Sequence, residues 1–135
     1  MKIVGVLGVV LLAVLTGCGG GGGNAGAEAV DRTAAAIARS VDVSLANLSA
    51  GDMSAGGISY LTSNITDRRG EVLGSGGESS LEQDALQAWV EARFEMSASG
   101  GYLGKTQENA IVCLRFEVHL RYADYTTYDE IDCPA

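Results

Sequence analysis

The segment from Ser99 to Thr106 has residue types that bind phosphate in nucleotide-binding loops. Its letters, SGGYLGKT, differ from the pattern G-x-x-x-x-G-K-[ST] only at the first position. In that pattern the loop follows a strand and opens a helix, whose backbone amides hold the phosphate. Here Gln107, Glu108 and Asn109 follow instead, and then a strictly alternating stretch typical of a strand. We therefore interpret the segment as the loop of a β-hairpin.

His119 is the only histidine, which excludes a metal site built from several histidines. A Ser-His-Asp site would need a serine nucleophile, and the sequence has no G-x-S-x-G motif to mark one. Carboxylates near the C-terminus could bind calcium, but their spacing does not fit an EF-hand loop. These acids are Asp124, Asp129, Glu130 and Asp132. We predict no catalytic residue, no metal site and no cofactor, and we keep a hydrolase with an unrecognised site as the alternative.

The net charge limits the classes of partner. The chain has 17 acidic and 9 basic side chains, for a formal net charge of −8. Because Lys and Arg supply most of the attraction to phosphate, this charge opposes binding to nucleic acid. A chain of 135 residues has room for one small domain.

The N-terminus has the pattern of an export signal. A lysine at the second position precedes an almost purely apolar run from Ile3 to Leu15. A membrane-spanning helix needs about 20 apolar residues, and a run of glycines from Gly19 to Gly23 follows before that length is reached. We predict that residues 1–17 form a signal peptide. We also predict a flexible tether over residues 18–27, because glycine has no side chain to pack.

Leu15-Thr16-Gly17-Cys18 resembles the lipobox of bacterial lipoproteins, which is an aliphatic residue, two small residues and a cysteine. The resemblance implies cleavage before Cys18 and a diacylglyceryl group on its sulfur. Two acyl chains anchor a protein stably, whereas one chain is marginal. It also implies export and anchoring to the outer face of the cell membrane, or to the outer membrane of a two-membrane cell. An ordinary secretory peptide and an uncleaved anchor are the alternatives.

With Cys18 assigned to lipid by this resemblance, Cys113 and Cys133 remain as a pair in a compartment that permits disulfides. We predict that they are bonded, with free thiols or an intermolecular bond as the alternative. A hairpin that set them directly opposite each other would bring their Cα atoms to about 4.5–5.5 Å, within disulfide range. The same register would set Glu117 opposite Asp129, an unfavourable pair, so a bulge or a slip of one residue is also possible.

Apolar residues recur at spacings of three and four from Glu28 to Ala50, which predicts one amphipathic helix. They are Val30, Ala34, Ile37, Val41, Leu45 and Leu48. Gly51 follows and could serve as the C-terminal cap. A second, short helix is predicted from Met53 to Ile65, weakened by two glycines within it.

Strict alternation of apolar and polar residues predicts half-buried strands in the second half of the chain. It favours a strand from Leu86 to Ala98, although a helix over that segment is the alternative, and it marks a strand from Ile111 to Tyr122 most clearly. A final strand is predicted from Tyr125 to Asp132. A short strand from Glu71 to Leu73 is expected before a loop from Gly74 to Gly77.

A helix followed by strands in hairpins predicts an α+β fold for residues 28–135. In it, the N-terminal amphipathic helix packs on a small antiparallel meander sheet. The arrangement resembles cystatin-like or NTF2-like folds, and a fold alone implies no function. The stretch from Val90 to Cys133 resembles small lipoproteins of the actinobacterial type, on Cys113-Leu114-Arg115 and Asp132-Cys133-Pro134.

The sequence therefore predicts a membrane-anchored extracytoplasmic lipoprotein with a non-catalytic domain that binds an envelope protein or a small apolar ligand. A small hydrolase and a lipid or metabolite carrier are the alternatives. A pocket lined by Phe94, Phe116 and Ile37 would favour the carrier, and a pocket holding His119 near a serine and an aspartate would favour the hydrolase. Four aromatic residues could form a binding surface or pack across strands instead. They are Trp89, Tyr122, Tyr125 and Tyr128.

Overall fold

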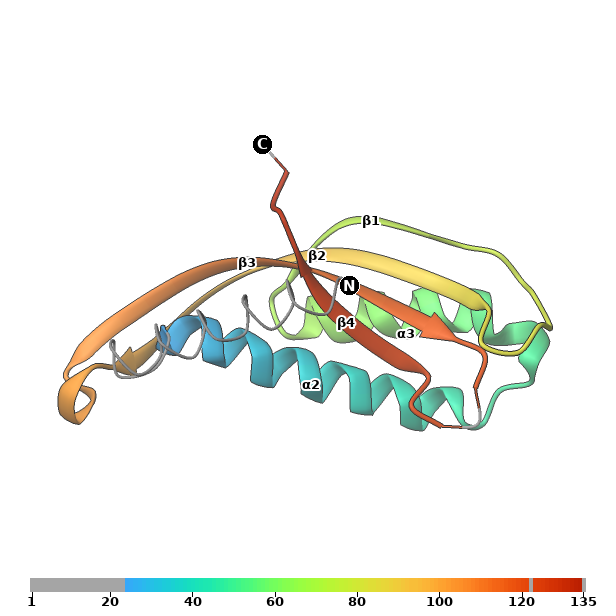
Figure 1. Ribbon diagram of the computed structural model, residues 1–135, viewed down its shortest axis with the longest axis horizontal. Helices are drawn as coiled ribbons and strands as arrows, with labels where there is room; N and C mark the ends of the chain where they lie inside the picture. Colours follow the sequence, from blue (N-terminus) through green and yellow to red (C-terminus); the bar gives the residue numbers. More distant parts are fainter. Residues whose placement is uncertain (1–23, 122, 135) are drawn as a thin grey trace, which may run out of the picture.

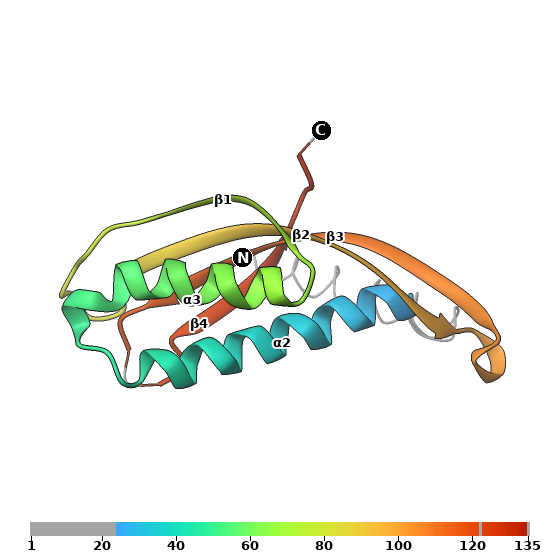
Figure 2. The ribbon, with the colours of Figure 1, turned by 180° about the vertical axis from the view of Figure 1, so that it is seen from behind.

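Two helices cover one face of a four-stranded sheet in the described part of the chain, as Figures 1 and 2 show. The structure, a computed structural model, describes residues 24–121 and 123–134. Its elements are α2 (Ala25–Leu45), η1 (Ala50–Asp52), α3 (Met53–Asp67), β1 (Glu71–Gly77), β2 (Leu86–Gly100), η2 (Tyr102–Gly104), β3 (Thr106–His119) and β4 (Thr126–Ile131). The sheet is an antiparallel meander in the order β1-β2-β3-β4. The predicted α+β class and meander sheet are confirmed, while the likeness to cystatin-like or NTF2-like folds stays a prediction.

The predicted signal peptide, residues 1–17, and Cys18 lie outside the described residues. Among the residues that are described, neither helix combines the length and the apolar character that crossing a bilayer requires.

Helix α2 begins inside the segment predicted to be a tether. The helix begins at Ala25, whereas the apolar periodicity predicted that it would begin at Glu28. The side-chain oxygen of Asn24 accepts a hydrogen bond from the backbone amide of Ala27 (3.1 Å), so Asn24 is the N-cap. The tether predicted over residues 18–27 is therefore wrong for its last three positions.

The first turn of α2 is tied to strand β3. The side-chain amide of Asn24 donates to the backbone oxygen of Asn109 (3.0 Å). The backbone amide of Ala25 donates to a carboxylate oxygen of Glu108 (2.7 Å). The second bond satisfies a helix-terminal backbone amide that would otherwise lack a partner, and both bonds join the start of the helix to the long β2–β3 hairpin.

Helix α2 ends at Leu45 rather than at the predicted Ala50, and Gly51 lies within η1 instead of capping it. The chain turns early because Leu48 packs on α3, where its side chain occupies the space that a Cβ on Gly56 would need. The predicted second helix is confirmed as α3.

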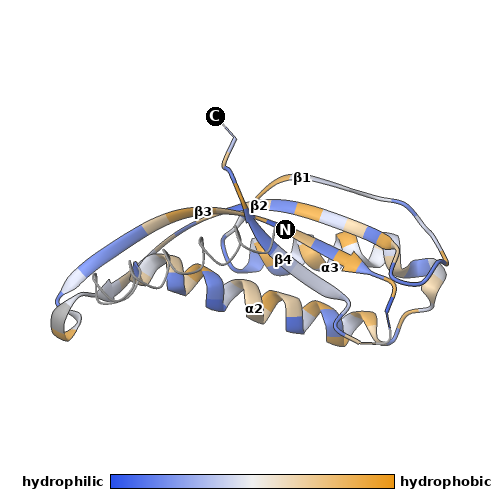
Figure 3. Ribbon diagram, in the orientation of Figure 1, coloured by the Kyte–Doolittle hydropathy of each residue, from blue (hydrophilic) through white to orange (hydrophobic). Residues whose placement is uncertain are grey.

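The core lies between the helices and the sheet, and it is built from the alternating residues that the strand patterns predicted. Helix α2 packs against β2, β3 and β4, and α3 packs against β1 and β2. Figure 3 shows apolar and polar positions alternating along β2 and β3. The side chains that the sheet contributes to this apolar core are Ala88, Val90, Ala92, Phe94, Leu114, Phe116 and Val118, and those of the helices include Val30, Ile37, Val41, Leu45, Leu61 and Ile65.

Strand β1 continues through the segment from Gly74 to Gly77, which was predicted to be a loop. Residues of this segment pair in register with β2: Ser75 faces Val90 and Gly76 faces Trp89. A Cβ on Gly76 would lie 2.7 Å from Nε1 of Trp89 on the neighbouring strand. Glycine is therefore accommodated in this strand because the Trp89 ring occupies the space that a side chain would need.

Strands β3 and β4 pair two residues away from the predicted register. Cys113 faces Ile131 rather than Cys133, and Arg115 faces Asp129. A shift of two keeps every side chain on its predicted face, because the side-chain period of a strand is two. It also removes the unfavourable pair of Glu117 with Asp129 and replaces it with an arginine opposite an aspartate.

Candidate functional site

The polar residues of β2 and β3 gather on the face of the sheet opposite the helices. Because Val90 and Phe116 are buried on the helix side, their strand neighbours point the other way. Register sets Trp89 opposite Glu117 and Glu91 opposite Arg115. We call the five residues Trp89, Glu91, Arg115, Glu117 and His119 the open-face cluster.

Arg115 lies at the centre of the open-face cluster. Its Nε donates to Oε2 of Glu117 (2.7 Å), and its Nη1 donates to Oε2 of Glu91 (3.1 Å). The guanidinium carbon is 4.5 Å from the centroid of the Trp89 ring, a cation–π contact. The hydrogen bond that Arg115 donates to Glu117 is the main reason why the pKa of Arg115 is raised above its ordinary value. A planar cation held by two carboxylates and a ring has one defined orientation.

The Trp89 ring can lie directly on β1 because the strand has glycines, which have no side chains, beneath it. A Cβ on Gly76 would clash with its ring, and a Cβ on Gly74 would lie 3.7 Å from Cζ3. The ring therefore lies over the glycine backbone of β1 and next to Arg115, and it stays partly exposed.

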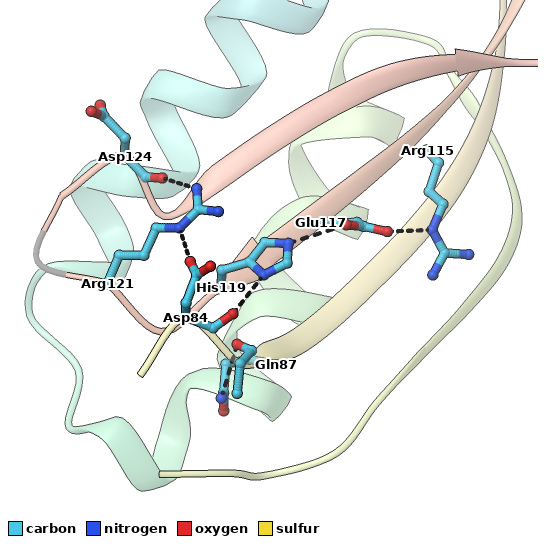
Figure 4. Close-up of polar contacts among 8 residues, drawn as sticks. Asp84, Gln87, Arg115, Glu117, His119, Arg121 and Asp124 are labelled. Carbon is cyan, nitrogen blue, oxygen red and sulfur yellow. Dashed lines mark hydrogen bonds and ion pairs between the residues drawn. The ribbon is translucent and has the colours of Figure 1, made fainter. Parts of the chain in front are cut away.

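His119 extends the cluster toward the loop before β2. Its Nε2 lies 3.1 Å from Oε1 of Glu117, and its Nδ1 lies 3.1 Å from the backbone oxygen of Asp84. Figure 4 shows the ring between these two groups. Both partners are acceptors, so only a ring with protons on both nitrogens donates to both.

A second set of contacts fixes the loop that leads into β2. Arg121 forms an ion pair with the Asp84 carboxylate through Nε, and its Nη1 donates to the backbone oxygen of Asp124 (3.3 Å), as Figure 4 shows. The hydrogen bond from Arg121 is the main reason why the pKa of Asp84 is lowered. The side-chain amide of Gln87 donates to the backbone oxygen of Ser80 (2.7 Å). The sequence pattern placed Gln87 on a polar face, whereas its side chain is fully buried and holds this loop.

Two shallow hollows flank the open-face cluster. One of about 290 Å³ is lined by Leu81, Gln83, Leu120 and Arg121. The other, of about 360 Å³, is lined by Gly77, Glu78, Leu86 and Trp89. Leu81 is 74% exposed at the edge of the first hollow, so apolar surface adjoins the charged residues.

The hydrolase alternative required a serine beside His119. Among the described residues, the ring hydrogen-bonds only to Glu117 and to a backbone oxygen of Asp84, and neither is a hydroxyl nucleophile. The carrier alternative required a pocket lined by Phe94, Phe116 and Ile37. All three are fully buried in the packed core.

The structure brings Cys113 and Cys133 together as predicted. Their sulfur atoms are 2.10 Å apart, a disulfide distance, and their Cα atoms are 5.2 Å apart. Cys113 is buried and faces Arg93 across β2, so the bond lies on the open face of the sheet. The chain after Ile131 consequently leaves the sheet on the side opposite the helices (Figure 1).

The other candidate sites suggested by the sequence do not form one site in the structure. The segment from Ser99 to Thr106 spans the end of β2, η2 and the start of β3, which confirms a hairpin loop. Among the described residues, no group of three or more His, Cys, Asp or Glu side chains could hold a metal ion. The aromatic residues do not share one surface, because Tyr128 packs on Phe116 at a centroid distance of 5.8 Å while Trp89 lies on the open face. Tyr122 lies outside the described residues.

Comparison of the chain with family models, curated proteins and solved structures finds no match.

Proposed function

We propose that this chain is an exported lipoprotein, anchored through Cys18 to the outer face of a membrane, whose domain binds another envelope protein without catalysing a reaction. The lipobox-like sequence before Cys18 supports the anchoring. The observation that carries the binding role is the partly exposed pair of Trp89 and Arg115 on the open-face cluster. Tryptophan and arginine are the residue types that contribute most often to protein–protein affinity.

The geometry of the pair favours binding because it is already ordered. Arg115 is fixed by Glu91 and Glu117, and Trp89 is seated on the glycines of β1. Immobilising a long side chain on binding costs about 0.5–1.5 kcal/mol, and prior ordering avoids most of that cost. The Arg115 side chain nevertheless remains 30% exposed, so a partner can reach it.

Anchoring is tested by replacing the lipidated residue. We expect the wild-type protein to sediment with membranes, and the variant Cys18→Ser to be lost from them, because two acyl chains are needed for stable anchoring. Mass spectrometry of the wild-type N-terminal peptide should find a diacylglyceryl group on Cys18. A Cys18→Ser protein that has lost residues 1–17 and still sediments with membranes would contradict the proposed anchor.

Binding is tested by site-specific photo-crosslinking in the native envelope. A photoreactive residue at Thr127, which faces Glu117 in register, should crosslink to a partner, and the added substitution Trp89→Ala should abolish that product. The matched control is a photoreactive residue at Val43, which is 71% exposed on α2. A product at Val43 alone, or one at Thr127 that survives Trp89→Ala, would place the interface elsewhere.

A small apolar ligand is a second candidate, favoured by a hollow of about 270 Å³ between α2 and β4. Its wall includes Val30, Val112, Leu114 and Tyr128, and the acidic residues Asp31, Asp129 and Glu130 also line it. Val112→Phe should fill this hollow, so the variant should lose binding of the fluorescent probe N-phenyl-1-naphthylamine while its circular dichroism spectrum stays unchanged. Equal probe binding by wild type and variant would exclude the hollow as the site.

A further inference from the structure

The end of the β2–β3 hairpin lies at the same end of the molecule as the start of α2. In Figures 1 and 2, the two strands extend beyond the helices to a turn, and the first residues of α2 lie beside them. The bonds of Asn24 to Asn109 and of Ala25 to Glu108 fix this arrangement. The connection between α2 and α3 lies at the opposite end.

The turn of this hairpin presents an apolar side chain and a positive charge. Leu103 is 72% exposed, and its φ of 60° is in the left-handed region. Holding a non-glycine residue in that region costs roughly 1–2 kcal/mol, so an exposed leucine there gains neither burial nor local stability. Lys105 is the only lysine after the predicted signal peptide, and it lies two residues away.

The link between Cys18 and the domain is short. Asn24 is the sixth residue after Cys18, and six residues span at most about 20 Å when fully extended. From Asn109, which is bonded to Asn24, strand geometry brings Leu103 within about 20 Å as well. The far end of α2 is 21 residues along the helix, about 30 Å further from the link. A lipid on Cys18 therefore holds the hairpin end nearest the bilayer.

We propose that the hairpin turn at Leu103 and Lys105 enters the interfacial region of the bilayer to which Cys18 is anchored. This proposal rests on the proposed anchoring. Leu103 would lie among the first acyl carbons, where burial of its exposed surface is favourable, and Lys105 would extend to the lipid phosphates. The anchor supplies the proximity, because a tethered group meets the surface at high effective concentration.

The net charge of the chain affects how the hairpin turn can reach a membrane. A net charge of −8 repels anionic lipids, so free diffusion to the surface is unfavourable. Contact therefore depends on the lipid anchor and on one apolar side chain rather than on a basic surface.

The test is fluorescence quenching in lipid vesicles, with the full lipidated protein reconstituted into phosphatidylcholine. The chain has one tryptophan, so Trp89→Phe combined with Leu103→Trp leaves a single reporter at the hairpin turn. Entry into the bilayer should blue-shift the emission of this reporter, and brominated phosphatidylcholine should strongly quench it. The matched control is Trp89→Phe combined with Val43→Trp, because Val43 is 71% exposed near the far end of α2. Its emission should not change.

The outcomes separate the two proposals. Lipidated protein that sediments with vesicles but shows no quenching at position 103 would overturn the hairpin contact and leave the anchoring in place. Equal quenching at positions 103 and 43 would also overturn it, because the domain would then have no preferred end. A chain that carries no lipid on Cys18 would overturn both proposals.

Discussion

Glu117 is the carboxylate on which the open-face cluster depends, because it accepts hydrogen bonds from both Arg115 and His119. The bond from Arg115 holds the pKa of Glu117 below its ordinary value of 4.5, partial burial opposes this, and the bond from His119 adds to it. The folded protein therefore binds this proton less tightly than the unfolded chain. The resulting stability is complete above pH 4.5 and is lost as the pH falls through the pKa of the folded state.

We expect Glu117→Gln to lower the free energy of unfolding by about 1 kcal/mol at neutral pH, the upper range for a partly exposed ion pair. The difference from wild type should shrink as the pH falls below 4.5. Urea unfolding at several pH values measures it. Glu95→Gln is the control, since Glu95 is 65% exposed and lies 3.7 Å from Arg93, and it should change little. A constant difference at all pH values would show that the ionised carboxylate is not the cause.

Leu103 allows a second prediction for a single residue. Its φ of 60° suits glycine, which pays no steric penalty there. Leu103→Gly should raise the free energy of unfolding by about 1 kcal/mol, as measured by urea denaturation in solution. The same variant should weaken hairpin contact with vesicles. A loss of stability would mean that the leucine makes folded-state contacts that its exposure does not reveal.

The close approach of α2 to the sheet depends on glycine in its first turn. A Cβ on Gly26 would lie 2.6 Å from the backbone oxygen of Met96 and 2.8 Å from the backbone nitrogen of Ala110. Backbone atoms cannot rotate away as a flexible side chain can. We expect Gly26→Ala to destabilise the fold by about 1–3 kcal/mol, although alanine favours helix intrinsically.

Gly51→Ala is the matched control for that substitution. Nothing lies within 4 Å of a Cβ at this position, so the change should be neutral or stabilising by less than about 1 kcal/mol. Thermal unfolding of both variants compares them directly. If Gly26→Ala were as stable as Gly51→Ala, the first turn of α2 would not be pressed against the hairpin.

At the scale of elements, hydrophobic periodicity was sufficient for α2, α3, β2 and β3, because each buries one face against the same core. Periodicity did not predict the bounds of an element where those bounds depend on a residue of another element. Helix α2 ends early because Leu48 packs over Gly56, and β1 extends through glycines because Trp89 lies on them. The residues of each segment alone predict a longer α2 and a loop in place of the second half of β1.

The open-face cluster was only partly predictable for a similar reason. Alternation placed Arg115 and Glu117 on the polar face of their strand. Which side chains meet across strands depends on the register, and the alternation along β2 and β3 gave no register between them. For the next pair of strands, the predicted β3–β4 register was two residues away from the observed one. The sequence contained a signal for the difference, because the predicted register opposed Glu117 to Asp129 while the observed register opposes Arg115 to Asp129.

For the molecule as a whole, the disulfide should be the largest single contribution to stability that can be removed chemically. It joins residues 20 apart in sequence and secures the last strand to β3. Reduction should lower the free energy of unfolding by about 3 kcal/mol on the chain-entropy model. Urea unfolding with and without dithiothreitol measures this. Cys133→Ser should show no effect of dithiothreitol, and a wild-type protein equally stable in both conditions would contradict the prediction.

The cap of α2 by Asn24 has a mechanical consequence. Tension between the lipid on Cys18 and the domain reaches α2 at its N-cap, Asn24, whose side chain is bonded to Asn109 and whose following backbone amide is bonded to Glu108. The load is therefore carried first by two bonds to the hairpin, before any turn of α2 can unwind. Asn24→Ala removes one of them, so in single-molecule pulling from the N-terminus it should lower the force at which the helix begins to peel from the sheet.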